Sequence, residues 1–421
     1  MENRRQFMGQ VIGGTAALAA LVPARRVLGA NDRVRFALIG AGGRGTADLR
    51  SALKCSNVEA VAVADVYTRR LDQVKRWIPN AKQYGDFRRL LDDKSIDAVI
   101  IATPQHQHAL NFVPALEAGK DVYQEKTMAF NPDHARRMKR AFLGSNRVVQ
   151  VGIQSTSAPV QQKARDLASP DSMGVITALH THMYRNAAYG GWGRALPADC
   201  NPEHVDWKMF QGEAAPHPFD PNRVINWRFF WDYSGGNVFE NMVHQVGFWY
   251  KALGLGIPSL VQMTGANYIS PNMEVPDTMN VSLEQPEKLL FTWNSGFGNR
   301  FYTADDDLLL GRKGTLIRHD ENIRYLSEGE RHHEPVDGPA ASTRAGNSGE
   351  TGNARPDIVN GGDETVMHMQ NFFDCVRSRK EPNCPFELGY KSAIACQMAL
   401  AALHRKRAVR WDAEREEIVP V

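Results

Sequence analysis

The chain has 421 residues, of which 43% are hydrophobic and 23% charged, which suits a globular protein of two or three domains. Its formal net charge is +3, and the first 30 residues carry all of it, with four arginines against one glutamate. The neutral remainder argues against a nucleic-acid surface or an anionic membrane partner. The five cysteines are widely spaced without a CxxC pair, so neither a zinc cluster nor a disulfide framework is indicated.

Residues 1–30 have the layout of an export signal. Arg4-Arg5-Gln6-Phe7-Met8 resembles the twin-arginine motif, an apolar run follows at 11–22, and small residues precede a cleavage point at Ala30. An amphipathic terminus is the alternative. The run is too short and glycine-rich to span a bilayer of about 30 Å, so we expect no integral membrane segment in the mature chain. The expected location is periplasmic, or otherwise exported by the twin-arginine route.

Residues 31–154 alternate between strand and helix patterns. The expected strands are 33–40, 59–65, 97–104, 120–126 and 147–154, and the expected helices are 41–54, 68–78, 85–91, 106–119 and 131–146. The strands are apolar on both faces, as in a central parallel sheet. This order predicts an N-terminal Rossmann domain with a doubly wound parallel sheet.

The pattern changes after residue 154. Residues 155–366 contain a strand at 175–185, a loop rich in Gly, Pro and aromatic residues, and several strand-like runs between 255 and 330. These predict an α/β domain with a large, mostly antiparallel open sheet, serving substrate binding and oligomerisation. Residues 331–357 read as a long polar loop. Residues 367–421 carry two helical patterns, at 367–380 and 389–406, expected to pack back on the core.

The first motif is the glycine turn after the first strand, Gly40-Ala41-Gly42-Gly43-Arg44-Gly45. Glycines there let the backbone approach a pyrophosphate at a helix amino terminus, so all but Ala41 are cofactor-binding candidates. Asp65 ends the second strand, where a carboxylate accepts hydrogen bonds from ribose hydroxyls and repels a 2′-phosphate. We therefore expect NAD as the cofactor, with Arg69 and Arg70 leaving NADP open.

Two further motifs lie at strand ends that face the same crevice. Thr103 and His106 follow the third strand and are expected near the nicotinamide. His106 and His108 are two residues apart, on different faces of a helix, so no metal site is expected. Glu125 and Lys126 end the fourth strand, where a lysine can hydrogen-bond a substrate hydroxyl. A surface ion pair is the alternative reading of these two residues.

The run SGGNVFENMVHQVGFW, residues 234–249, places Glu240 and His244 on one face of an expected helix. A second polar and aromatic set suits a sugar, because aromatic faces stack on sugar rings and polar groups bind hydroxyls. The residues predicted to bind substrate are His182, Tyr184, Arg185, Asn186, Trp192 and Trp227. His180, Tyr189 and Arg228 belong to the same set, and 226–228 fits core packing equally well.

These motifs, in this order, resemble the Gfo/Idh/MocA oxidoreductases over residues 33–412, including the closing segment from His368 to Asp412. The resemblance implies a Rossmann domain, then an α/β domain whose open sheet often forms homodimers or homotetramers. Lys126 matches the family's catalytic lysine in EKP, with Thr127 in place of proline. His244 and Glu240 match the histidine and aspartate of DxGxH, which makes all three residues catalytic candidates.

The expected function is NAD(P)-dependent oxidation or reduction of a sugar, glycoside or polyol hydroxyl. Because free dinucleotide is scarce outside the cytoplasm, we expect the cofactor to stay bound and to be recycled within each turnover. His244 is the expected general acid/base, since an unperturbed imidazole titrates near neutral pH. One alternative is an NAD-dependent glycosidase that oxidises transiently and eliminates. Another is a non-catalytic saccharide- or partner-binding protein on the same fold.

Overall fold

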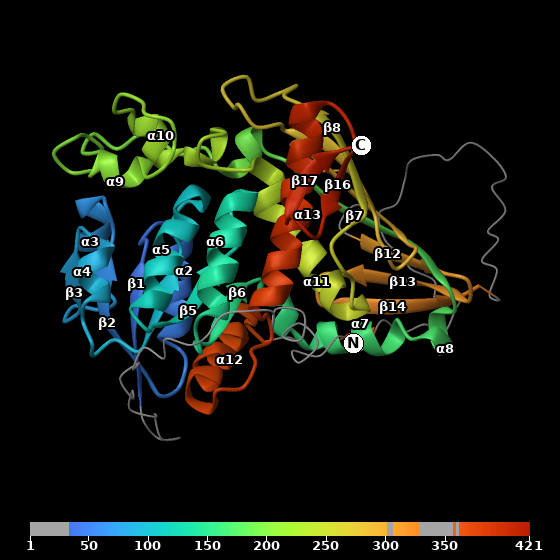
Figure 1. Ribbon diagram of the computed structural model, residues 1–421, viewed down its shortest axis with the longest axis horizontal. Helices are drawn as coiled ribbons and strands as arrows, with labels where there is room; N and C mark the ends of the chain where they lie inside the picture. The colour runs from blue at the N-terminus through green and yellow to red at the C-terminus, as the bar shows by residue number, and fades with distance from the viewer. Residues whose placement is uncertain (1–32, 301–305, 329–356, 359–361) are drawn as a thin grey trace, which may run out of the picture.

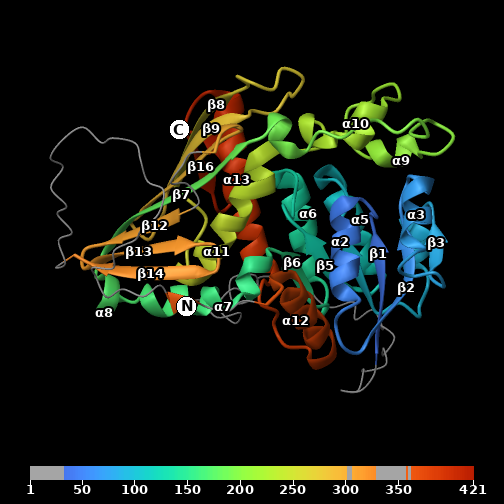
Figure 2. The ribbon, with the colours of Figure 1, turned by 180° about the vertical axis from the view of Figure 1, so that it is seen from behind.

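The computed structural model describes residues 33–300, 306–328, 357–358 and 362–421. The predicted signal peptide at 1–30 and nearly all of the polar loop at 331–357 lie outside these ranges. Two sheets form the framework, with helices packed around and between them (Figures 1 and 2). None of the helices within these ranges is long and apolar enough to cross a membrane.

The first sheet has six parallel strands in the order β3-β2-β1-β4-β5-β6. Its strands are β1 (Val34–Ile39), β2 (Val58–Ala64), β3 (Lys82–Tyr84), β4 (Ala98–Ile101), β5 (Asp121–Glu125) and β6 (Val149–Gly152). The helices of this part are α2 (Gly43–Ala52), α3 (Thr68–Val74), α4 (Phe87–Leu91), η1 (Gln105–Gln107), α5 (His108–Glu117) and α6 (Pro132–Leu143). The predicted doubly wound Rossmann sheet is confirmed. Only β3 was not expected, because three residues give too little pattern.

The second sheet has eleven strands in the order β15-β14-β13-β12-β7-β10-β9-β8-β16-β17, with β11 paired to β7. The strands are β7 (Ile176–Asn186), β8 (Leu260–Ala266), β9 (Thr278–Glu284), β10 (Leu290–Gly296), β11 (Gly298–Asn299), β12 (Asp306–Gly311), β13 (Gly314–His319), β14 (Asn322–Ser327), β15 (Asp357–Ile358), β16 (Val409–Asp412) and β17 (Glu417–Pro420). Every pairing is antiparallel except β7 with β10. The predicted mostly antiparallel sheet is confirmed.

Two long helices join the sheets into one core. α11 (Val243–Leu253) and α13 (Phe386–Arg405) lie between the two sheets (Figures 1 and 2). One buried apolar cluster runs from Ile39 in the first sheet through Trp249 to Leu316 in the second. Four further helices lie outside the arm and the first sheet's crossovers: η2 (Gln154–Ser157), α7 (Pro159–Leu167), α8 (Pro170–Met173) and α12 (Glu364–Ser378). Of these, α12 packs against α2, with Phe373 beside Phe36.

A covering arm, defined here as residues 187–233, extends from the end of β7 across the first domain (Figure 1). It contains η3 (Ala188–Gly191), α9 (Trp207–Gln211), α10 (Pro221–Ile225) and η4 (Trp227–Phe229). The sequence predicted a loop for the first part of the arm. The helices of the arm are too short to show a periodic pattern in the sequence. Its aromatic residues form a third apolar cluster, which includes Tyr67 of the first domain.

Candidate active site

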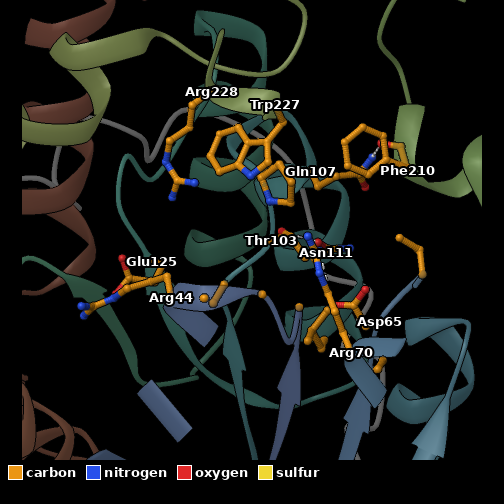
Figure 3. Close-up of a pocket in the computed structure, with 18 of the residues that line it drawn as sticks. Arg44, Asp65, Arg70, Thr103, Gln107, Asn111, Glu125, Phe210, Trp227 and Arg228 are labelled. Atoms are coloured by element: carbon orange, nitrogen blue, oxygen red, sulfur yellow. Dashed lines mark hydrogen bonds and ion pairs between the residues drawn. The ribbon is translucent and has the colours of Figure 1, made fainter. Parts of the chain in front are cut away.

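A cavity of about 590 Å³ lies between the carboxyl ends of the parallel strands and the covering arm (Figure 3). Eleven of the predicted site residues line it: Gly40, Gly42, Gly43, Arg44, Asp65, Thr103, Glu125, Lys126, Trp192, Trp227 and Glu240. Seven do not: Gly45, His106, His182, Tyr184, Arg185, Asn186 and His244. The arrangement agrees with the rule that ligands of open parallel sheets bind at the carboxyl ends of the strands.

The glycine turn is shaped for close approach of the chain to itself and to a ligand. Gly40 has a φ of +92°, and a Cβ on Gly45 would lie 1.9 Å from the carbonyl oxygen of Gly40. Gly45 therefore serves the packing of α2 against the turn and does not line the cavity. Around Gly43 there is open space, since a Cβ there would meet nothing within 4 Å. This cradle at the start of α2 fits the diphosphate of a dinucleotide.

Asp65 is almost fully buried at the end of β2. One carboxylate oxygen accepts a hydrogen bond from the Ala41 amide at 2.7 Å, and the other accepts one from the Tyr67 amide at 2.9 Å. Arg70 lies 3.8 Å from the first oxygen. Asp65 thus holds the glycine turn in place. A carboxylate has about four lone-pair positions, so it also retains acceptor capacity for a ribose hydroxyl.

Arg44 and Glu125 form a buried ion pair on the opposite side of the cavity, visible in Figure 3. Arg44 Nε lies 3.0 Å from Glu125 Oε1, and its Nη2 lies 2.9 Å from Asp48 Oδ1. Burial raises the pKa of Asp48, and the neighbouring Glu125 raises it further. The cation of Arg44 is therefore already matched by carboxyl groups of the first domain.

His106 occupies a different place from the predicted one. The sequence placed it near the nicotinamide, but its Nε2 lies 2.7 Å from the carbonyl oxygen of Phe210 in the covering arm. Burial lowers its pKa to about 3, so the ring is neutral and joins the arm to the first domain. Thr103, by contrast, lines the cavity and donates to Asn111 Oδ1 at 2.9 Å.

No group of three or more His, Cys, Asp or Glu side chains placed to hold a metal occurs among the described residues. His106 and His108 differ in their surroundings. His108 bonds to the carbonyl oxygens of Thr103 and Thr127, which lie beyond β4 and β5. Its two nitrogens are thus occupied by backbone groups.

The carboxylate of Glu240 is surrounded by two cations and one amide. Lys126 Nζ lies 2.7 Å from Glu240 Oε2, Arg228 Nε lies 3.2 Å from the same oxygen, and Gln105 Nε2 donates to Oε1 at 2.8 Å. Burial alone would raise the pKa of this carboxyl, but Arg228 and Lys126 lower it to about 2. Glu240 is therefore an anion at neutral pH, with hydrogen bonds from Lys126 and Gln105 and an ion pair with Arg228.

The backbone around Glu240 explains how it reaches this position. The residue lies on η5 (Val238–Met242), a π-helical turn that precedes α11, and such turns are frequent at functional sites. Thr127 follows Lys126, and its hydroxyl donates to the Phe239 carbonyl at 2.7 Å. A proline at position 127 could not make this bond, so threonine here ties the end of β5 to the π-helical turn.

His244 is partly buried at the start of α11 and does not line the cavity. Burial lowers the pKa of its imidazole to about 3, and the positive charges of Lys126 and Arg44 act in the same direction. The expectation of a pKa near neutrality is therefore corrected. The ring is neutral at pH 7, and Glu240 is the member of the pair that contacts Lys126.

The second-domain candidates divide into two groups. Trp192 and Trp227, from the arm, line the cavity. His182, Tyr184, Arg185 and Asn186 belong to β7 and lie outside it. Leu179 and Thr181 of this strand are buried on the face toward α11, so His182 and Tyr184 lie on the other face. Arg185 instead donates to the Gly190 carbonyl and lies over the Trp192 ring at 5.7 Å.

Three residues of the site go beyond the sequence-based predictions. The sequence fits Arg228 to core packing equally well, and it gives no specific prediction for Gln105 or Arg194. Arg194 and Arg228 line the cavity, and Gln105 holds Glu240 from the end of β4. The place of Gln105 directly after the strand was the available signal, since side chains at strand ends of this sheet face the crevice.

Comparison with known proteins agrees with this geometry. Residues 34–153 match the GFO_IDH_MocA family model, described as an oxidoreductase family with an NAD-binding Rossmann fold. A glycosyl hydrolase family 109 protein of Stenotrophomonas maltophilia is 38% identical over 133 residues, which are 28% of each chain. An inositol 2-dehydrogenase of Mycolicibacterium smegmatis is 28% identical over 195 residues, 46% of this chain and 52% of that protein. The chain thus spans about half, or less, of these curated relatives.

Solved structures match over much more of the chain. Levoglucosan dehydrogenase in complex with NADH and levoglucosan has a TM-score of 0.67 and 16% identity, covering 90% of this chain and 99% of its own. The aldose-aldose oxidoreductase of Caulobacter crescentus has a TM-score of 0.65 and 16% identity, with the same coverage. Residues 34–153 are therefore similar to the NAD-binding Rossmann domain of the GFO_IDH_MocA oxidoreductase family, and the whole chain has the fold of these solved structures.

Proposed function

We propose that this chain is an NAD(P)-dependent oxidoreductase acting on a hydroxyl of a sugar, glycoside or polyol. The observation that carries the proposal is the contact between Lys126 Nζ and the ionised Glu240, in the same cavity as a dinucleotide-binding glycine turn. The relatives support the substrate class, since their names refer to inositol, levoglucosan and aldoses. Asp65 favours NAD, with NADP as the other nucleotide to test.

Bound nucleotide would accept a hydride from the substrate carbon, or return it. The chain's own residues handle the hydroxyl. The ammonium of Lys126 stabilises negative charge on the substrate oxygen, and such preorganised stabilisation is commonly a large part of catalysis. Glu240 Oε2 lies within hydrogen-bonding distance of Lys126 Nζ, so Lys126 can give a proton to the carboxylate as its nitrogen takes the proton of the hydroxyl. His244 remains a candidate for a supporting role.

The covering arm supports a tightly held and internally recycled cofactor. Asp206 N donates to the Val66 carbonyl at 2.9 Å, and Thr68 N donates to the His204 carbonyl at 3.0 Å. The Tyr67 hydroxyl donates to Asp199 at 2.8 Å. The arm is therefore fastened beside the end of β2, and we propose that a bound nucleotide leaves when these contacts open.

We also propose export of the folded, cofactor-loaded protein by the twin-arginine route, on the strength of the amino-terminal sequence. We further propose that the chain forms homodimers or homotetramers through the face of the second sheet that points away from α11. Cellular fractionation and light scattering of the mature chain test these two points separately.

The decisive test is to purify the mature protein, denature it and identify released nucleotide by mass and absorbance. We expect stoichiometric NAD, or NADP, and reduction of that bound nucleotide when the right sugar is added. Lys126→Ala should retain nucleotide and lose hydride transfer. A protein that releases no nucleotide and binds neither one when it is added would overturn the proposal, and Lys126→Ala with full function would point to a binding protein.

A second candidate is an NAD-dependent glycosidase, favoured by the similarity to the glycosyl hydrolase family 109 protein over 133 residues. In that cycle, oxidation acidifies a neighbouring C–H bond, elimination breaks the glycosidic bond, and the hydride is then returned. Cleavage of an aryl glycoside without net formation of NADH would establish it. Stable accumulation of NADH with an intact glycoside would establish the simple dehydrogenase.

A further inference from the structure

We infer that the substrate end of the cavity selects a sugar that bears a carboxylate, such as a uronic acid or its glycoside. This inference rests on the proposed function and narrows its substrate class. It comes from the charges around Lys126 and Glu240 and from two arginines of the covering arm that line the same cavity.

The charges that line the cavity divide into two parts. In the matched part, Arg70 lies beside Asp65, and Arg44 is paired with Glu125 and Asp48. In the other part, Lys126 and Arg228 share one carboxylate, Glu240, and Arg194 has no carboxylate within ion-pair distance among the described residues. These three cations therefore carry more charge than Glu240 offsets. A partly enclosed cavity of one sign attracts ligands of the other.

Arg228 is placed to receive a carboxylate. Its guanidinium lies over the Trp227 ring at 4.3 Å, and its Nε is the atom nearest Glu240. Its two Nη groups have no hydrogen-bonding partner within the described part of the chain, and its side chain is 27% exposed. In Figure 3 these groups point into the cavity. A planar guanidinium with free Nη groups matches a carboxylate in two parallel hydrogen bonds.

Arg194 is held close to the same turn of the arm. Its amide donates to Asn226 Oδ1 at 2.8 Å, and Asn226 Nδ2 donates back to the Arg194 carbonyl at 3.1 Å. Asn226 directly precedes Trp227 and is buried, so the two segments are fixed relative to one another. One Nη of Arg194 bonds to the carbonyls of Gly191 and Gly193, which leave its charge uncompensated.

The two tryptophans complete a surface for a charged sugar ring. Trp192 and Trp227 both line the cavity, and each has an arginine over its face, Arg185 and Arg228 respectively. The aromatic groups give apolar surface for the C–H groups of a sugar ring, and the guanidinium of Arg228 is a donor for an acidic substituent. A neutral hexose would leave the Nη groups of Arg228 without an anionic partner.

The test is isothermal titration calorimetry on the nucleotide-loaded protein, with D-glucuronate against D-glucose and D-galacturonate against D-galactose. We expect each acid to bind at least about tenfold more tightly than its neutral counterpart, since a hydrogen bond to a charged group is worth roughly 1.5–3 kcal/mol. Arg194→Gln and Arg228→Gln should each reduce this preference several-fold. Rising salt should reduce it too.

Arg324→Gln is the matched control, because Arg324 is exposed on β14 outside the cavity and its replacement changes the net charge equally. It should leave the preference unchanged. Equal binding of acid and neutral sugar, tighter binding of the neutral sugar, or binding of neither would overturn the inference. Nucleotide content, measured on the same preparation, separates this failure from failure of the proposed oxidoreductase.

Discussion

The carboxylate of Glu240 shows how one residue gains its chemistry from distant parts of the chain. Lys126, Arg228 and Gln105 come from β5, the arm and the end of β4, yet all three contact its two oxygens. The surrounding cations lower the pKa of the carboxyl to about 2 despite its burial. The group is therefore an anion at neutral pH. We expect it to hold a proton only briefly, while Lys126 transfers one from the substrate.

We predict that Glu240→Gln lowers the rate of hydride transfer by about 100-fold or more, the range in which a positioned acid/base group contributes. The amide keeps the shape but leaves Lys126 and Arg228 without a counter-charge. Single-turnover absorbance of the bound nucleotide measures the effect. Glu284→Gln, an exposed replacement on β9, is the control. An unchanged rate with intact nucleotide content would exclude Glu240 from the chemistry.

At the scale of elements, the π-helical turn η5 depends on the two glycines before it. Gly236 has a φ of +57°, and a Cβ there would lie 2.8 Å from Val275. We predict that Gly236→Ala destabilises the protein by roughly 1–3 kcal/mol, from backbone strain and overpacking together. It should also lower activity, because η5 carries Glu240.

Gly119→Ala is the matched control, since Gly119 has a φ of +72° but a Cβ there would meet nothing within 4 Å. Gly119→Ala therefore introduces backbone strain without a steric clash. Thermal unfolding of the two variants then isolates the clash with Val275. If both variants lose equal stability and activity, η5 does not depend on the space that Gly236 leaves.

The covering arm is the second element whose role can be measured. We predict that Tyr67→Phe speeds nucleotide release by about threefold to tenfold, because it removes a hydrogen bond worth roughly 1 kcal/mol between the first domain and the arm. Release can be followed by trapping freed NAD. Tyr325→Phe removes a comparable bond to the Ser172 carbonyl at 2.8 Å, away from the cavity, and should leave the rate unchanged. Equal release rates for both variants and the parent would contradict a role of the arm in retaining the nucleotide.

At the scale of the whole molecule, buried histidines link folding to pH. Burial lowers the pKa of His106, His244 and His368 to about 3 in the folded protein, against about 6.5 in an unfolded chain. The unfolded state then binds more protons below pH 6.5, so stability falls as the pH falls from about 6.5 towards 3. Above 6.5 these groups add no pH dependence.

We therefore predict that the midpoint of thermal unfolding falls steadily between pH 7 and pH 5. Replacement of His368 by glutamine, which cannot gain the proton, should flatten this slope even if the midpoint at pH 7 is lower. Replacement of the exposed His319 by glutamine is the comparison. A midpoint that is constant, or that rises on acidification, would contradict neutral burial of these histidines.

Local patterns determined the identity of the framework. Apolar strands alternating with helices predicted the Rossmann sheet, and the glycine turn with Asp65 predicted the nucleotide end of the cavity. Such features can be predicted from the sequence because each depends on a few neighbouring residues. A strand needs its own apolar run, and a turn needs its own glycines. Lys126 was predicted from its place at a strand end and Glu240 from its helical spacing with His244, and the resemblance to a family then made both of them catalytic candidates.

Tertiary structure decided which candidates meet. His106 and Gln105 lie next to each other in sequence, yet one supports the arm and the other holds Glu240. His244 has the sequence of an acid/base group, but burial beside two cations removes the near-neutral pKa on which that role depended. In the sequence, Arg228 fits core packing equally well. Only the folded arm places it over the strand ends. Charge and burial are set by contacts between distant segments, and these contacts exist only in the folded chain.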